Sequence, residues 1–124
     1  MTITDDLHHC DTILVVEDNV LLALDAAASV TAAGCDVVMT ARSGEALALL
    51  ASRSFRGAIL DFNVQDGTVA GIVKRLTEAA IPFRVVSAMT PAIIEQAGIP
   101  RDVIRSKPID YDNVVDDILS ARAA

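Results

Sequence analysis

Short apolar runs alternate with amphipathic stretches along almost the whole chain. The apolar runs are rich in β-branched residues and are bounded by charged or turn-forming residues, which is typical of buried strands. They cover residues 12–16, 36–40, 57–60, 83–86 and 103–105. Each run leads into a stretch in which apolar residues recur at helical spacing. The pattern therefore predicts five units of one strand followed by one helix.

Start and stop signals place the helices between these strands. A Leu/Ala-rich stretch ends before Gly34, which suits the position after a helix, and Pro91 follows Thr90 at the start of a short helix. Ser43 and Asp110 are the expected caps of the second and last helices. The expected inward faces are Ala46, Leu47, Leu50 and Ala51 in the second helix, Val69, Ile72, Val73 and Leu76 in the third, and Val114, Val115, Ile118 and Leu119 in the last.

Strands that alternate with helices predict a parallel sheet with right-handed crossovers, that is, a doubly wound α/β fold. The strands are apolar throughout, as expected of a sheet covered on both faces. The 124 residues suffice for one domain, which we assign to residues 12–124. The polar residues 1–11 are expected to form a flexible lead-in and show no signal-peptide pattern.

Composition and charge exclude several classes of function. The formal charge is −7 and no basic run exists, which argues against binding to nucleic acid or to an anionic membrane. No apolar stretch approaches the roughly 20 residues of a membrane span. Two cysteines are too few for a disulfide scaffold, so we expect a cytoplasmic protein.

The candidate chemistry lies directly after the strands, because ligands of open parallel sheets bind at the carboxyl ends of the strands. The second strand ends in Thr40-Ala41-Arg42 and offers no candidate. The other four strands are followed by Glu17 and Asp18, by Asp61 and Asn63, by Ser87, and by Lys107 and Pro108.

Three carboxylates at one edge repel one another, so the fold needs a positive charge to offset them. Mg²⁺ is the natural partner because it prefers oxygen ligands, and Lys107 supplies a second positive charge. A carboxylate nucleophile beside a metal, an ammonium and a hydroxyl outlines a site of phosphoryl transfer. Taken singly, these residues also fit ordinary turns, and Ser87 and Lys107 fit a strand end and a surface lysine.

The segments VVEDN, ILDFN, VVSA and SKPID, in this order and spacing, resemble the receiver domain of two-component response regulators. Each segment alone is a weak signal, whereas the ordered set is specific. The resemblance covers residues 12 to about 122. It implies a flavodoxin-like fold with a five-stranded parallel sheet in the order 2-1-3-4-5.

The resemblance also implies a role for each candidate residue. Asp61 corresponds to the phosphoacceptor, and Ser87 to the hydroxyl residue that moves toward the phosphoryl group. Lys107 corresponds to the lysine that contacts the phosphoryl oxygens, and Pro108 to the proline that follows it, often after a cis peptide bond. Mg²⁺ is then bound by Asp18 directly, by Glu17 through water, by Asp61, and by the backbone carbonyl of Asn63.

The sequence departs from the family's pattern in three places. Ile104 stands where the family often has an aromatic switch residue, so another route for the output signal is needed. Tyr111 lies close in the sequence but not at that position. Val64-Gln65 replaces the usual Leu-Pro, which predicts a differently shaped loop. Met89 lies where the family tunes the lifetime of the phosphoryl group, and its apolar side chain favours slow loss.

We therefore expect a single-domain receiver that takes a phosphoryl group from a sensor histidine kinase or a histidine phosphotransfer protein. It is not expected to be an enzyme beyond its own Mg²⁺-dependent phosphorylation and dephosphorylation. Its output passes to an unknown protein target, and the family has a precedent for homodimers through the fourth helix, fifth strand and fifth helix. The alternative is a degenerate receiver that acts as a phosphorylation-independent adaptor. A flavin mononucleotide binder is disfavoured because Glu17 and Asp18 would repel its phosphate, and a phosphatase because no substrate pocket is apparent.

Overall fold

The sheet has five parallel strands, and its order agrees with the sequence prediction. The computed structural model describes residues 12–121. Within this range the sheet runs β2-β1-β3-β6-β7, with all four pairings parallel. The strands are β1 (Thr12–Val16), β2 (Asp36–Thr40), β3 (Gly57–Asp61), β6 (Phe83–Ser87) and β7 (Ile104–Ser106). This corresponds to the predicted order 2-1-3-4-5 of a doubly wound sheet. The predicted lead-in, residues 1–11, lies outside the described residues.

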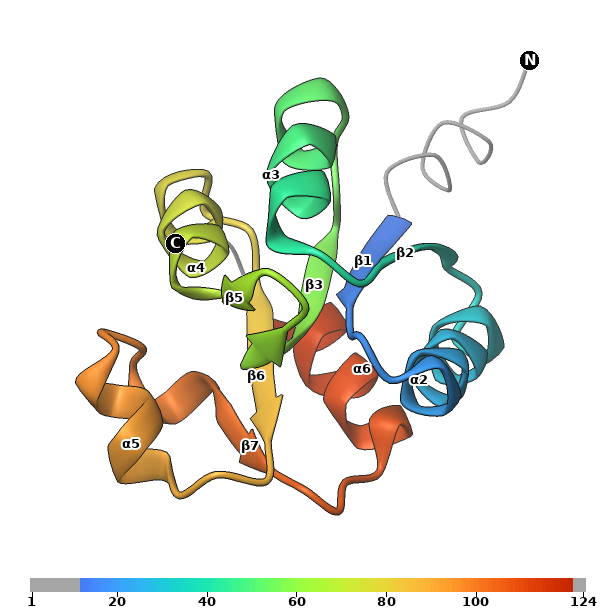
Figure 1. Cartoon of the computed structure of the whole chain (residues 1–124). Coiled ribbons are helices and arrows are strands. Elements are labelled where there is room, and N and C mark those ends of the chain that lie inside the picture. The colour runs from blue at the N-terminus through green and yellow to red at the C-terminus, as the bar shows by residue number, and fades with distance from the viewer. Residues whose placement is uncertain (1–11, 122–124) are drawn as a thin grey trace.

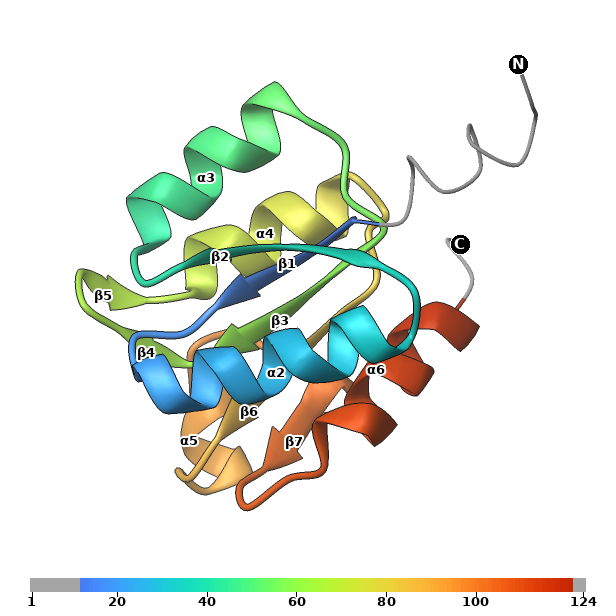
Figure 2. The ribbon, with the colours of Figure 1, turned by 90° about the vertical axis from the view of Figure 1, so that its right-hand side faces the viewer.

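Helices cover both faces of the sheet, as Figure 2 shows with α2 and α6 on one side and α3 and α4 on the other. The helices are α2 (Val20–Ala32), α3 (Ser43–Ser52), α4 (Ala70–Glu78), α5 (Pro91–Gln96) and α6 (Tyr111–Ser120), with a short 3₁₀ turn at Arg101–Val103. Figure 1 shows these helices beside the strands of the sheet. Among residues 12–121, no helix is long and apolar enough to cross a membrane.

Two apolar cores lie on the two faces because side chains alternate along each strand. Leu14, Leu60 and Val85 pack against α3, α4 and α5 on one face. Ile13, Ile59 and Val86 pack against α2 and α6 on the other. Every residue of β1 is buried, which explains its unbroken apolar sequence.

The start of α3 differs from the prediction. Arg42 occupies the N-cap position, and Ser43 is already the first helical residue. The prediction that Ser43 caps this helix is therefore wrong. Its hydroxyl donates instead to the carbonyl of Thr68 at 2.9 Å. The predicted inward face is also partly wrong, because Leu47 and Ala51 are exposed, while Leu49 packs on the core with Leu50.

A small antiparallel hairpin follows β3 and was not predicted. Its strands are β4 (Asn63–Val64) and β5 (Gly67–Thr68), in the segment where Val64-Gln65 had indicated an unusual loop. Gly67 has φ +123°, a backbone conformation that side chains with a Cβ rarely adopt. The last strand also begins one residue later than predicted, at Ile104, because residues 101–103 form the 3₁₀ turn.

Candidate functional site

Strand register brings the predicted site residues to one edge of the sheet. Val16 pairs with Leu60, so Glu17 and Asp61 directly follow neighbouring positions of β1 and β3. Asp61 in turn pairs with Val86, which places Ser87 one residue beyond it on β6. The backbone N–H of Lys107 donates to the carbonyl of Ser87 at 2.8 Å. The carboxyl ends of β1, β3, β6 and β7 therefore meet at the same place.

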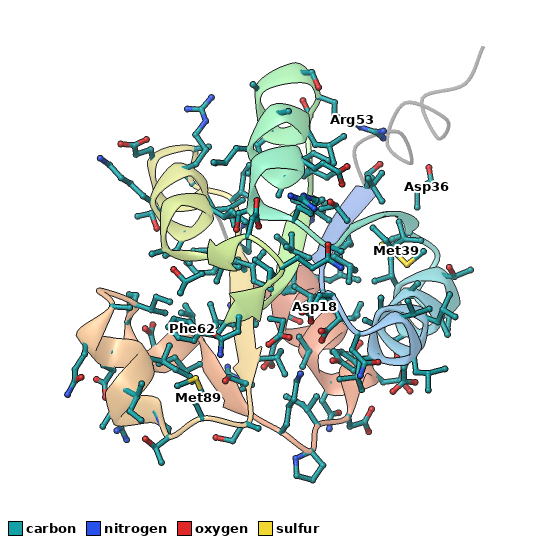
Figure 3. The ribbon with its side chains drawn as sticks, in the orientation of Figure 1. Asp18, Asp36, Met39, Arg53, Phe62 and Met89 are labelled. Atoms are coloured by element: carbon teal, nitrogen blue, oxygen red, sulfur yellow. The ribbon has the colours of Figure 1, made fainter. Side chains whose placement is uncertain are left out.

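Three carboxylates gather at this edge. Oxygen atoms of Glu17, Asp18 and Asp61 all lie within 4.8 Å of one another. Glu17 is buried, Asp61 is half-buried and Asp18 is exposed, so the cluster runs from the interior to solvent. Figure 3 shows Asp18 near the middle of this edge. The arrangement offers a cation a set of oxygen ligands that is open on one side.

Lys107 reaches the cluster from the end of β7. Its Nζ lies 3.3 Å from Oε1 of Glu17 and 3.6 Å from Oδ2 of Asp61. The lysine side chain is only 20% exposed. One ammonium thus contacts two of the three carboxylates, which leaves the cluster with an excess of negative charge.

Burial and the neighbouring acidic group shift the pKa of Glu17. Burial raises the pKa of its carboxyl above the usual value, and the neighbouring Asp61 carboxyl raises it further. The N–H of Asn19, which donates to Glu17 at 3.1 Å, and the charge of Lys107 act in the opposite direction. The net pKa shift is upward, and burial is its largest cause.

Ser87 and Asn63 lie on the side of the site nearer to α5. Ser87 is buried, and its hydroxyl oxygen accepts a hydrogen bond from the backbone of Met89 at 3.0 Å. Asn63 is exposed, and its amide nitrogen lies 3.1 Å from the sulfur of Met89. Figure 3 shows Met89 on this side, together with Phe62. The peptide bond between Lys107 and Pro108 is cis, as the sequence suggested.

Comparison with solved structures identifies the fold. No family model matches the chain, and no curated protein matches it at a significant level. Among the solved structures, a response regulator receiver protein from Sinorhizobium medicae WSM419 superposes with a TM-score of 0.78 at 21% identity, over 88% of this chain and 91% of that chain. The PhyR response regulator REC domain from Erythrobacter litoralis gives 0.76 at 16% identity, over 92% and 95%. The chain has the receiver-domain fold.

A third structure with the receiver fold contains ligands. It is a response regulator protein from Burkholderia pseudomallei with a phosphorylated aspartic acid, a calcium ion and citrate. Its TM-score is 0.74 at 17% identity, over 89% of this chain and 67% of that chain. At this level of identity the likeness establishes the fold, and the chemistry of this chain has to be argued from its own residues.

Ile104, which stands in place of an aromatic residue, and Tyr111 are both buried. Ile104 is buried against the α3, α4 and α5 core, so an apolar aliphatic side chain occupies that position. Tyr111 begins α6 and is buried in the opposite core. Burial raises the pKa of its hydroxyl to about 12, and the charges of Glu17 and Asp61 contribute to this rise. The phenol therefore lies within the electrostatic reach of the site, from the α2–α6 side.

Sequence reasoning missed the contribution of the end of β2 to this receiver fold. Thr40 is buried, and its carbonyl accepts a hydrogen bond from the N–H of Glu17 at 3.0 Å. Its hydroxyl donates to the carboxylate of Glu45 in α3. Residues 40–42, which offered no candidate for the chemistry, thus help to hold Glu17 through a backbone hydrogen bond. A polar threonine that ends an apolar strand was the available signal.

Asp66 was also missed. Its carboxylate accepts hydrogen bonds from the backbone of Ser43 at 2.7 Å and of Gly44 at 3.0 Å, and so caps α3 from the β4–β5 turn. An Asp-Gly pair is a turn signal, and it would have indicated the hairpin. The helix that it caps starts 23 residues earlier in the chain, which no local pattern reveals.

Proposed function

We propose that this chain is a phosphoacceptor receiver, in which Asp61 takes a phosphoryl group in the presence of Mg²⁺. The observation that carries the proposal is the joint placement of three carboxylates and one lysine at the carboxyl edge of the sheet. The Lys107 ammonium lies 3.3 Å from Glu17 and 3.6 Å from Asp61. The three carboxylates and the lysine come from three different strand ends. Phosphoryl transfer needs this combination of a carboxylate nucleophile, metal-binding oxygens and a positive charge.

The donor atoms of the cluster suit magnesium. Glu17, Asp18 and Asp61 supply only oxygen, and hard divalent cations prefer oxygen ligands. The exposed side of the cluster leaves room for water, which magnesium retains. When bound, the metal neutralises negative charge on the transferring phosphoryl group. We assign Asp18 and Asp61 as direct ligands, Glu17 as a ligand through water, and Asn63 as a ligand through its backbone carbonyl.

The transfer step uses a carboxylate oxygen of Asp61 as the nucleophile. This oxygen forms a bond to phosphorus while the bond from phosphorus to the imidazole nitrogen of a phosphohistidine breaks. The electron pair of the broken bond stays on that nitrogen. Loss of the group follows when water attacks phosphorus, inorganic phosphate departs, and the Asp61 carboxylate is restored.

The remaining site residues stabilise the transferred group. Lys107 is already beside Asp61 and donates to phosphoryl oxygens, where its charge opposes the charge that develops. Ser87 ends the strand next to Asp61 and has a hydroxyl that is able to donate to another phosphoryl oxygen. Pro108 fixes the backbone that follows Lys107. Outside its own phosphorylation and dephosphorylation, the chain is not proposed to be an enzyme.

The donor is a phosphohistidine on a sensor histidine kinase or a histidine phosphotransfer protein, and the output passes through contacts with a further protein. We place this exchange in the cytoplasm. The alternative, a phosphorylation-independent adaptor, has less support, because crowded carboxylates are costly to retain without a cation. Two features favour that alternative, namely Ile104 in place of an aromatic residue and the unusual Val64-Gln65.

The test is incubation with a small phosphodonor and Mg²⁺, followed by measurement of the intact mass. Wild-type protein should gain one phosphoryl group that is stable in acid and labile in base, and Asp61→Asn should gain none. Asp116→Asn, the same change on the exposed face of α6, is the matched control and should be phosphorylated like the wild type. Absence of any mass gain in wild-type protein, with partner binding that needs no Mg²⁺, would favour the adaptor.

A further inference from the structure

Helix α3 begins without a cap from its own residues. The N-cap residue Arg42 makes no side-chain hydrogen bond to the helix. The first N–H groups of a helix need acceptors, and here Asp66 supplies them from the β4–β5 turn. Its Oδ1 accepts from Ser43 at 2.7 Å and its Oδ2 from Gly44 at 3.0 Å. Both oxygens of one carboxylate are therefore used to hold a helix that is distant in sequence.

Further contacts fasten the same two segments together. The hydroxyl of Ser43 donates to the carbonyl of Thr68 at 2.9 Å. The backbone N–H of Gln65 donates to the carbonyl of Ala41 at 3.4 Å. The hairpin at residues 63–68 is thus attached to residues 41–44 by its turn and by β5.

Each of these segments begins at the carboxylate cluster. The hairpin starts at Asn63, two residues after Asp61. The loop follows Thr40, whose carbonyl accepts from the backbone of Glu17 at 3.0 Å. The hydrogen bonds of Asp66 therefore connect the two segments. Through them, Glu17 is linked by the end of β2, the start of α3 and the hairpin to Asp61.

We propose that Asp66 is a positioning residue of the metal site. By capping α3 it holds the β4–β5 hairpin, and with it the backbone of Asn63, in the geometry that binds Mg²⁺, without touching the metal. This inference rests on the magnesium site of the proposed function. Removal of the Asp66 carboxylate breaks two of the bonds between the hairpin and α3 and leaves those of Ser43 and Gln65, so the backbone carbonyl assigned as a ligand is held less firmly.

The ionisation of Asp66 is consistent with this role. The N–H groups of Gly44 and Ser43 lower the pKa of its carboxyl below the usual value, and the charge of Arg42 contributes in the same direction. The carboxylate form, with both oxygens free to accept, is therefore the form present at neutral pH.

Mg²⁺ binding to wild-type protein, Asp66→Ala and Asp66→Asn tests the proposal, measured by calorimetric titration with the metal alone. We expect Asp66→Ala to bind Mg²⁺ about tenfold more weakly, as is common when a residue that orients a ligand is lost. Asp66→Asn keeps one acceptor oxygen, so its affinity should lie between the two. Amide hydrogen exchange at Gly44 should be faster in Asp66→Ala than in wild-type protein. In phosphorylation by the small donor, the half-saturating Mg²⁺ concentration should rise while the rate at saturating Mg²⁺ stays near the wild-type rate.

Ile118→Val separates this effect from a general loss of stability. Ile118 packs next to Gly57, at the opposite end of the sheet from the carboxylates. The variant should lower stability and leave the Mg²⁺ affinity unchanged. An unchanged affinity in Asp66→Ala despite faster exchange at Gly44, or an equal loss of affinity in Ile118→Val, would overturn the proposal. If Asp66→Ala does not fold, wild-type affinity in Asp66→Asn overturns it. Failure of wild-type protein to bind Mg²⁺ overturns the proposed metal site itself, which is a distinct result.

Discussion

The charge balance of the carboxylate cluster leads to a prediction about Lys107. Among residues 12–121, Lys107 is the basic residue whose side chain lies within 4 Å of both Glu17 and Asp61. Lys107→Met keeps a side chain of similar length and removes the charge. Without Mg²⁺, the variant leaves three carboxylates close together with no ammonium beside them. We expect it to be less stable than the wild type in chelator, and to gain more stability from Mg²⁺.

The magnitude follows from the distances and the burial. At 3.3 and 3.6 Å, each contact represents a gross attraction of about 5 kcal/mol at an effective dielectric constant near 20. Much of this attraction is offset by the desolvation of the ammonium and by the loss of side-chain freedom. Removing one partner of a buried ion pair typically costs about 3–5 kcal/mol. Because the lysine side chain is 20% exposed and the cluster is open at Asp18, we expect the low end of that range.

The assay is urea-induced unfolding, in chelator and at saturating Mg²⁺. A loss of about 3 kcal/mol corresponds to a melting temperature lower by roughly 10 °C in a domain of this size. A ligand that binds only the folded state adds stability in proportion to the logarithm of its affinity. The added stability should therefore be larger in Lys107→Met, since its site is more negative and binds the cation more tightly.

Lys74→Met is the matched control, because Lys74 lies on the exposed surface of α4. The same change of side chain there should alter stability by no more than about 0.5 kcal/mol, with or without Mg²⁺. Wild-type stability of Lys107→Met in chelator would refute the electrostatic reasoning. So would an equal gain from Mg²⁺ in Lys107→Met and the wild type.

Three further predictions concern other parts of the molecule. Gly57→Ala should destabilise the fold by about 1–3 kcal/mol in urea, because the new Cβ would meet the Cγ2 methyl of Ile118; an unchanged midpoint would contradict the tight packing there. Asp110→Ala should cost about 1 kcal/mol, since the carboxylate accepts from the N–H of Asp112 at the start of α6, and Asp112→Ala should cost less. Tyr111 is the single tyrosine, so phenolate absorbance reports on it alone. It should titrate near pH 12 in folded protein and near its ordinary value of 10 in urea. Because its folded pKa is the higher one, stability should fall as the pH rises above 10. A folded midpoint near 10 would refute its burial.

Much of the fold and of the candidate site follows from local patterns. Four of the five sheet strands have five residues and are mainly apolar, and parallel pairing requires a long connection, usually a helix, between successive strands. The carboxyl ends of parallel strands then share one edge, so residues that directly follow a strand become neighbours. This is why Glu17, Asp61 and Lys107 could be predicted to meet although they are far apart in the chain. Predicting this meeting of side chains required only the parallel topology of the sheet and the positions at which the strands end.

What the sequence did not reveal depends on contacts between distant loops. Asp66 caps a helix that starts 23 residues earlier, and Ser43 bonds the hairpin where a local pattern suggested a cap. The strands β4 and β5 have two residues each, so they are too short to show an alternation of apolar and polar residues. In α3, Leu49 packs on the core together with Ala46 and Leu50, whereas Leu47, which was expected there, is exposed.

These missed contacts lie on one side of the carboxylate cluster, between the end of β2 and the hairpin. The other side is held by the backbone bond from Lys107 to Ser87 at 2.8 Å. Two kinds of structure therefore position the site, namely the paired strands and the hairpin. Strand pairing, which hydrophobic pattern dictates, fixes Glu17, Asp61 and Ser87, whereas the hairpin that carries Asn63 depends on a few polar bonds outside the sheet. Hydrogen bonds near solvent contribute less to stability than buried strand pairing does. A single substitution can therefore change the geometry of the hairpin without loss of the fold.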